Sequence, residues 1–183
     1  QVLRPEDWEV LKRSGRVTVV DAGPSTNLSF FWFNLGSPAD NARGDWFRSP
    51  LFRRAVSWAV DRSAIVNSAY KGYASPAYSL VTASHLRWFL GPEAFLPPGE
   101  PSAEARRLLR EAGFQLQEQG RRPLLLDSQG RPVRFELLTR SDETLGRTAA
   151  IVQQDLAQLG IEVLIRQEEF RAVIPGSCSP ATM

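Results

Sequence analysis

The alternation of apolar and polar residues predicts a succession of short helices and strands. The clearest signal is a pair of helices at 50–59 and 62–71, where apolar residues recur every three or four positions. Ser49 can cap the first helix, and Pro50 suits its first turn because the missing N–H group needs no partner there. Asp61 offers a carboxylate to the N–H groups that open the second helix. The same spacing predicts further helices at 3–11, 101–112 and 142–159.

Strands are predicted where helical spacing gives way to β-branched and aromatic runs. Residues 16–21 form one such run. Residues 27–35 are apolar on both alternating faces, which is typical of a central strand that is covered on both sides. Between residues 73 and 99 no periodicity is visible, and the prolines and aromatic residues there predict a long loop held in place by its aromatic side chains.

The C-terminal half predicts a hairpin followed by a βαβ unit. Residues 124–126 and 133–138 flank a polar turn, in which Gly130 is available for a positive φ. Ser141 is expected to cap the last helix. That helix joins 133–138 to a buried type of strand at 161–165, so we expect the two strands to be parallel.

Composition limits the classes of function. The 183 residues, with 43% hydrophobic and 23% charged, are typical of an ordinary globular domain. No apolar run approaches the roughly 20 residues that cross a bilayer. A net charge of +2, with the arginines scattered among acids, argues against a nucleic-acid partner. The single cysteine, Cys178, cannot form an internal disulfide.

Catalytic and metal chemistry receive little support from the residues. His85 is the only histidine. Ser84 precedes it in sequence, but adjacency in sequence does not imply the geometry of a catalytic pair. A hydrolase would need His85 close to an exposed Ser or Asp. The hydrolase function stays open as an alternative. One histidine and one cysteine are too few for a transition-metal cage, and no glycine-rich phosphate motif is present. We therefore expect a protein that is not an enzyme and has no cofactor and no metal site.

Aromatic residues favour a binding function instead. In 30–34 the alternation places Trp32 and Asn34 on one face of the strand and Phe31 and Phe33 on the other. We expect Phe31 and Phe33 in the core, whereas Trp32 and Asn34 are candidates both for the core and for ligand binding. The long loop contains two further candidate ligand-binding residues, Tyr78 and Trp88. The alternative is that these two side chains only anchor the loop.

Several motifs in sequence order resemble those of a known family. They are Phe33-Asn34, Phe52-Arg53-Arg54-Ala55, Ala59-Val60-Asp61-Arg62, Gly72, and two helices that run into a glycine, at 105–114 and 153–163. Together they resemble the extracytoplasmic solute-binding proteins of peptide and nickel ABC importers, which are bacterial solute-binding protein family 5. The similarity covers about residues 3–170.

The resemblance implies an α/β fold. It would be an incomplete lobe of the type II periplasmic-binding-protein kind, with a mixed β-sheet flanked by helices. Residues 1–26 would lead in from a missing first lobe, 27–174 would form part of the second lobe, and 175–183 would be a disordered tail. The charged groups that anchor ligands in this family cannot be placed on any residue of this chain.

The resemblance also implies a function. The protein would capture a solute outside the cytoplasm, in the periplasm or anchored at the cell surface, and deliver it to the permease subunits of an ABC importer. A peptide is the favoured solute, and nucleic acid is not expected as a partner. The alternative is a ligand-sensing domain of a transcriptional regulator that reuses the same fold.

Overall fold

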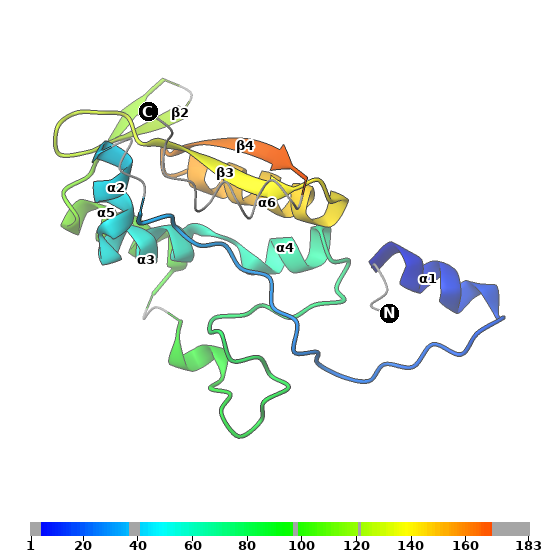
Figure 1. Ribbon diagram of the computed structural model, residues 1–183. Coiled ribbons are helices and arrows are strands. Elements are labelled where there is room, and N and C mark those ends of the chain that lie inside the picture. Colours follow the sequence, from blue (N-terminus) through cyan, green and yellow to red (C-terminus); the bar gives the residue numbers. More distant parts are fainter. Residues whose placement is uncertain (1–4, 37–40, 97–98, 121, 170–183) are drawn as a thin grey trace. The chain divides into compact units, whose positions relative to one another are not determined.

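The computed structural model describes residues 5–36, 41–96, 99–120 and 122–169 (Figure 1). The chain divides into two compact units, which we describe separately. The N-terminal unit comprises residues 1–30 and 62–96, and the sheet unit comprises 31–61 and 97–183. The predicted tail at 175–183 lies outside the described residues.

The sheet unit contains all the strands of the described chain. Its antiparallel pair consists of β1 (Gln115–Gln119) and β2 (Arg122–Leu126). Its parallel pair consists of β3 (Arg134–Arg140) and β4 (Glu162–Glu168), in the register Phe135 to Val163. The helices of this unit are α2 (Asn41–Arg48), α3 (Pro50–Ala59), α5 (Pro101–Glu111) and α6 (Glu143–Ala157).

Helix α3 forms where the sequence predicts it, and with the predicted cap. The Ser49 hydroxyl accepts a hydrogen bond from the Phe52 amide at 3.3 Å, and Pro50 occupies the first turn. Helix α3 packs against α5. Apolar residues at helical spacing are buried on both helices: Phe52, Ala55 and Val56 on α3, and Ala105, Leu108 and Leu109 on α5.

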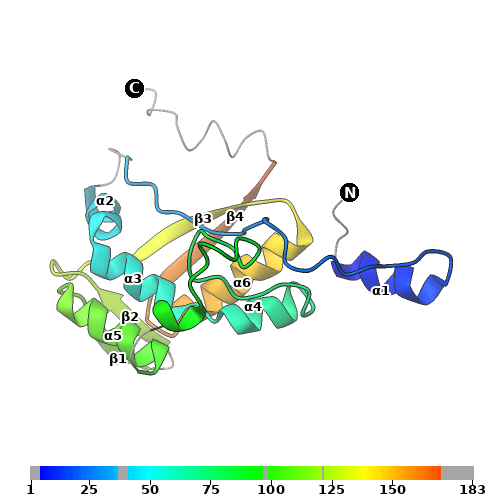
Figure 2. The ribbon, with the colours of Figure 1, turned by 90° about the horizontal axis from the view of Figure 1, so that it is seen from below.

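The predicted βαβ unit is confirmed, with one correction at its helix. Helix α6 connects the parallel strands β3 and β4 and packs against both of them (Figure 2). Its N-cap is Asp142, whose carboxylate accepts from the Leu145 amide at 2.9 Å. The prediction of Ser141 as the cap was therefore wrong by one residue. The Ser141 amide donates instead to the Glu168 carbonyl at 3.1 Å, which ties the start of the helix to the end of β4.

The predicted hairpin has a different strand partner. Strand β2 pairs with β1, and only one bridge, from Leu126 to Pro132, joins it to the chain beyond the turn. Gly130 has the expected positive φ of +74°. The chain leaves the turn to form β3, which finds its partner in β4 because the βαβ connection places that strand alongside.

Close backbone contact connects β2 to the turn after α6. The Leu125 amide donates to the Gly160 carbonyl at 2.9 Å. A Cβ atom on Gly160 would lie 2.5 Å from the Leu125 nitrogen, and its φ is +76°. Glycine is required at this position for both reasons.

The N-terminal unit contains three helical segments and no strand among its described residues. They are α1 (Pro5–Ser14), α4 (Arg62–Ser68) and the 3-10 turn η1 (Pro92–Ala94). Contacts between its two chain segments hold the unit together: the Trp8 and Tyr73 rings lie 5.4 Å apart, and the Ser29 and Tyr70 hydroxyls are 2.9 Å apart. The predicted loop at 73–99 is confirmed, since η1 is the only regular element among its described residues.

The strands predicted at 16–21 and 27–35 do not form. Both segments lack regular structure, although 27–35 has the composition of a buried strand. A strand exists only where another strand supplies hydrogen-bond partners, and no described segment pairs with either. The expectation that 27–35 is covered on both sides was wrong as well, because Phe30 is 61% exposed and Trp32 is 65% exposed.

Candidate functional site

Phe33 anchors the aromatic segment 31–35 to the core of the sheet unit. Its ring centroid lies 5.1 Å from that of Phe47 and 6.3 Å from that of Phe52, the buried residue at the start of α3. Phe47 in turn meets Phe135 of β3 at 5.3 Å. The prediction of Phe33 as a packing residue is therefore supported. Phe31 contacts Phe33 at 5.9 Å but remains 39% exposed, so its expected burial was wrong.

Trp32 and Asn34, the two candidates of this segment, are both exposed. Because successive residues of extended chain point to opposite sides, anchoring through Phe33 turns its neighbours away from the core. The Asn34 side-chain oxygen accepts from the Gly36 amide at 3.0 Å, so part of its hydrogen-bonding capacity is used within its own turn. The Trp32 indole is 65% exposed and thus offers a large aromatic surface.

Tyr78 and Trp88, the two candidates of the N-terminal unit, differ in their surroundings. The Arg62 guanidinium lies 5.0 Å from the centroid of the half-buried Tyr78 ring and donates to the Ala77 carbonyl at 3.0 Å. Burial lowers the pKa of Arg62. These contacts support the anchoring alternative for Tyr78. Trp88 is 71% exposed, with the Arg87 guanidinium 5.8 Å from its ring.

Each unit therefore holds two of the four predicted ligand-binding residues. In the sheet unit they are two positions apart on one extended segment, Trp32 and Asn34. In the N-terminal unit they are ten positions apart in one loop, Tyr78 and Trp88. The role of all four in ligand binding stays a prediction.

His85 makes only local hydrogen bonds. Its Nδ1 atom lies 3.2 Å from the Thr82 hydroxyl and 3.4 Å from the Ser84 hydroxyl, and the side chain is exposed. No hydrogen bond or ion pair joins His85 to a carboxylate within the described ranges. A serine nucleophile needs a base that is itself oriented by a third group. The geometry therefore gives the hydrolase alternative no support.

Other predicted absences concern metals and membranes. Among the described residues, no group of three or more His, Cys, Asp or Glu is arranged to hold a metal ion. Cys178 lies outside those ranges. In the part of the chain that the structure describes, no helix has both the length and the apolar character to cross a membrane.

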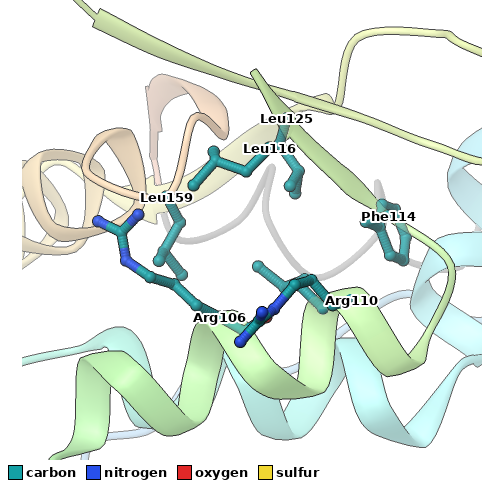
Figure 3. A pocket seen from close by; sticks show the side chains of 7 residues that line it. Arg106, Arg110, Phe114, Leu116, Leu125 and Leu159 are labelled. Carbon is teal, nitrogen blue, oxygen red and sulfur yellow. The ribbon is translucent and has the colours of Figure 1, made fainter. Parts of the chain in front are cut away.

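A pocket in the sheet unit was not predicted from the sequence. It has a volume of about 290 Å³ and lies between α5 and the β1–β2 pair (Figure 3). Two arginines and five apolar residues line it: Arg106, Arg110, Leu109, Phe114, Leu116, Leu125 and Leu159. Arg106 and Arg110 are among the arginines that the sequence scatters among acids, so no binding role was predicted for them. Their spacing of four residues, next to the apolar stripe of α5, was the available sign.

Comparison with known proteins places the chain in a family. Residues 1–177 match the sequence profile described as "Bacterial extracellular solute-binding proteins, family 5 Middle". The oligopeptide-binding protein AppA of Bacillus subtilis is 28% identical over 171 residues, which is 92% of this chain and 29% of AppA. The glutathione-binding protein GsiB of Salmonella choleraesuis is 31% identical over 119 residues, 65% of this chain and 20% of GsiB.

Solved structures show the same relationship. The structure of AppA in complex with a nonapeptide aligns with a TM-score of 0.58 and 27% identity, over 74% of this chain and 26% of AppA. An ABC transporter substrate-binding protein from Sinorhizobium meliloti aligns with a TM-score of 0.58 and 28% identity, over 91% and 32% of the two chains. The α/β fold predicted for a lobe of a type II periplasmic binding protein is thereby confirmed. The chain spans less than a third of the length of these relatives.

Proposed function

Because this chain belongs to the bacterial extracellular solute-binding proteins of family 5, we propose that it is part of a protein that captures a solute for an ABC importer. A peptide is the favoured solute, since the names of two relatives specify an oligopeptide and glutathione, itself a short peptide. The protein would work outside the cytoplasm and deliver its solute to membrane permease subunits. It would bind without catalysing a reaction.

We propose for residues 27–174 the role of a partial second lobe, with 1–26 leading into it. Proteins of this kind enclose a ligand between two lobes that close by a hinge motion. Affinity in such a site comes from walls on both sides of the ligand. A chain that supplies only part of those walls should therefore bind its solute weakly.

The exposed indole of Trp32 is the observation that carries this proposal. It is 65% exposed although the next residue, the half-buried Phe33, contacts the rings of Phe47 and Phe52. Exposed aromatic side chains have few rotatable bonds, so they bind peptide side chains with little loss of conformational entropy. We infer that Trp32 and Asn34 contribute one wall of a solute site. Trp88, in the N-terminal unit, is a separate candidate for ligand contact.

The test is a calorimetric titration of the complete binding protein that contains these residues, using a mixture of short peptides and then the best single peptide. We expect Trp32→Ala to weaken peptide binding by about tenfold, the usual cost of removing an aromatic anchor. Leu164→Ala is the matched control, because Leu164 is 50% exposed and lies on β4. It should leave the affinity unchanged.

Three outcomes would separate the parts of the proposal. If peptides bind equally well to the wild type and to Trp32→Ala, the solute class stands and the role of Trp32 is refuted. If no peptide binds the complete protein, the favoured solute is wrong. Tight, stoichiometric peptide binding by the 183-residue chain alone would contradict the partial-lobe proposal.

A further inference from the structure

The pocket between α5 and the β1–β2 pair has the chemistry of a second binding site. We propose that it binds a small amphipathic carboxylate, of the class of a free medium-chain fatty acid. The carboxylate would pair with Arg106 and Arg110, and the hydrocarbon chain would lie among the apolar residues (Figure 3). This inference does not rest on the proposed function, because the pocket shares no residue with the four candidates for solute binding.

The apolar side of the pocket suits a hydrocarbon chain. Leu125 and Leu159 are core residues at 1% and 2% exposure, and the half-buried Leu116 of β1 also lines the pocket, so its floor is apolar. A volume of about 290 Å³ has room for about ten water molecules at liquid density. The same room accommodates a chain of roughly eight carbon atoms with its carboxylate. Burying that chain supplies a favourable contribution for each methylene group.

The charged side of the pocket selects an anion. Arg106 and Arg110 are one turn apart on α5, and the lining contains no acidic residue. Neither guanidinium forms an ion pair with a carboxylate among the described residues. Their hydrogen bonds go to backbone carbonyls, from Arg106 to Gln158 at 3.2 Å and from Arg110 to the carbonyl of Arg106 at 3.4 Å.

Arg107, between them in sequence, shows the contrast. Its guanidinium pairs with Glu104 at 2.8 Å and with Glu111 at 2.7 Å, and it does not line the pocket. Two like charges one turn apart repel each other. A bound carboxylate would relieve this repulsion through charge-assisted hydrogen bonds, which are stronger than neutral ones. Within the described part of the chain, the pocket therefore has two guanidiniums without a hydrogen-bonded carboxylate, unlike Arg107, although the charge of Arg106 also acts on the Glu100 carboxylate.

Other ligand classes use only part of this lining. A strongly hydrated anion such as phosphate would leave the leucines without contact. An uncharged hydrocarbon would leave the two guanidiniums without an anion, and an alkylammonium ion would be repelled by them. The combination of one carboxylate and one short apolar chain uses both sides of the pocket.

The test titrates the 183-residue chain with sodium octanoate while its backbone amide signals are followed by nuclear magnetic resonance. We expect saturable shifts centred on Leu116, Leu125 and Leu159, and none with acetate or octylamine at the same concentrations. Arg106→Gln and Arg110→Gln should each weaken octanoate binding about threefold to tenfold, in keeping with the loss of one charge-assisted hydrogen bond. Arg107→Gln is the matched control on the same helix and should bind like the wild type.

A second variant tests the pocket by filling it. Leu116 is half-buried on β1, and Leu116→Phe should block the octanoate shifts while the thermal unfolding transition is retained. The proposal is overturned if octanoate causes no saturable shifts, or if its affinity is the same in Arg106→Gln, Arg110→Gln and Arg107→Gln. Vesicles of phosphatidylglycerol provide a further arm. Loss of vesicle binding in the arginine variants, with no binding of free octanoate, would assign the site to a lipid surface and refute the free carboxylate.

Discussion

Asp127 is the one charged side chain that the structure places in the core of the described residues, at 4% exposure. Its carboxylate accepts from the Gln129 and Arg131 amides, both at 2.9 Å, from the Arg131 Nε at 2.8 Å and from the Trp46 indole at 3.1 Å. Burial by itself raises the pKa of the Asp127 carboxyl. The hydrogen bonds outweigh burial, and the net pKa is lowered.

The lowered pKa of Asp127 predicts a loss of stability in acid. The unfolded chain takes up the proton more readily, at a pKa of about 3.9. The contribution of Asp127 is therefore complete above that pH, and it is lost as the pH falls through the lower pKa of the folded state. At pH 7 we expect Asp127→Asn to reduce the free energy of unfolding by about 2 kcal/mol. The asparagine side chain has one acceptor oxygen where the aspartate has two, so N–H donors such as the Arg131 guanidinium and the Trp46 indole lose an acceptor.

Urea unfolding of both proteins from pH 7 down to pH 2 measures this effect. The difference between wild type and Asp127→Asn should shrink below about pH 4, where the unfolded wild-type chain begins to take up the proton while the folded carboxylate still resists it. Asp21→Asn is the control, since the exposed Asp21 carboxylate accepts from the Gly23 amide in a similar local turn. A difference that stays constant with pH would contradict the role assigned to the Asp127 charge.

Helix α6 provides a prediction at the scale of an element. Its start contains two adjacent residues that both favour the cap position, and the structure selects Asp142 over Ser141. We expect Asp142→Ala to lower the free energy of unfolding by about 1 kcal/mol, because the Leu145 amide loses its acceptor. Ser141→Ala is the matched control and should change it by less than about 0.5 kcal/mol, as at other surface positions. Chemical denaturation of the two variants compares them, and equal losses would show that the cap is shared.

Elements with local signals could be predicted from the sequence, and elements that depend on a distant partner could not. The start of α3 was fixed by Ser49, Pro50 and Phe52, which lie within four residues of one another. Strand β1 (Gln115–Gln119) is mostly polar and gave no strand pattern. It forms because α5 ends just before it and β2 returns alongside. The opposite error at 27–35 has the same cause, since composition alone supplies no strand partner.

The candidate site shows the same division between local and distant information. The alternation in 30–34 correctly separated Phe33, which packs, from Trp32, which is exposed. It could not reveal that Phe31 stays 39% exposed, because that depends on what covers the segment. The pocket was missed because its walls come from parts of the chain that are far apart in sequence: α5, the β1–β2 pair and Leu159. Arg106 and Leu159, for example, are 53 positions apart.

At the scale of the whole molecule, the two units differ in how much apolar surface each buries. Of the buried apolar side chains within the described residues, Ala69 alone belongs to the N-terminal unit. The others belong to the sheet unit, to which α3, α5 and α6 contribute buried residues such as Phe52, Leu108 and Leu156. Buried apolar contacts and protected backbone hydrogen bonds set the local free energy of opening. The two units should therefore open with very different free energies.

This contrast predicts a two-phase pattern in hydrogen exchange followed by mass spectrometry. Peptides from 73–91, which contain no helix or strand, should exchange within the shortest labelling times, because their amides lack regular backbone partners. Peptides covering α5 and α6 should be protected by orders of magnitude more, since each of those helices has three buried apolar residues. Helix α4 is the internal comparison, because it has no buried residue within its bounds. If burial sets protection, the α4 amides should exchange quickly. If helix formation alone sets protection, they should exchange slowly. Protection of α4 equal to that of α6 would show that the N-terminal unit has a core of its own, and would refute the assignment of the stable core to the sheet unit.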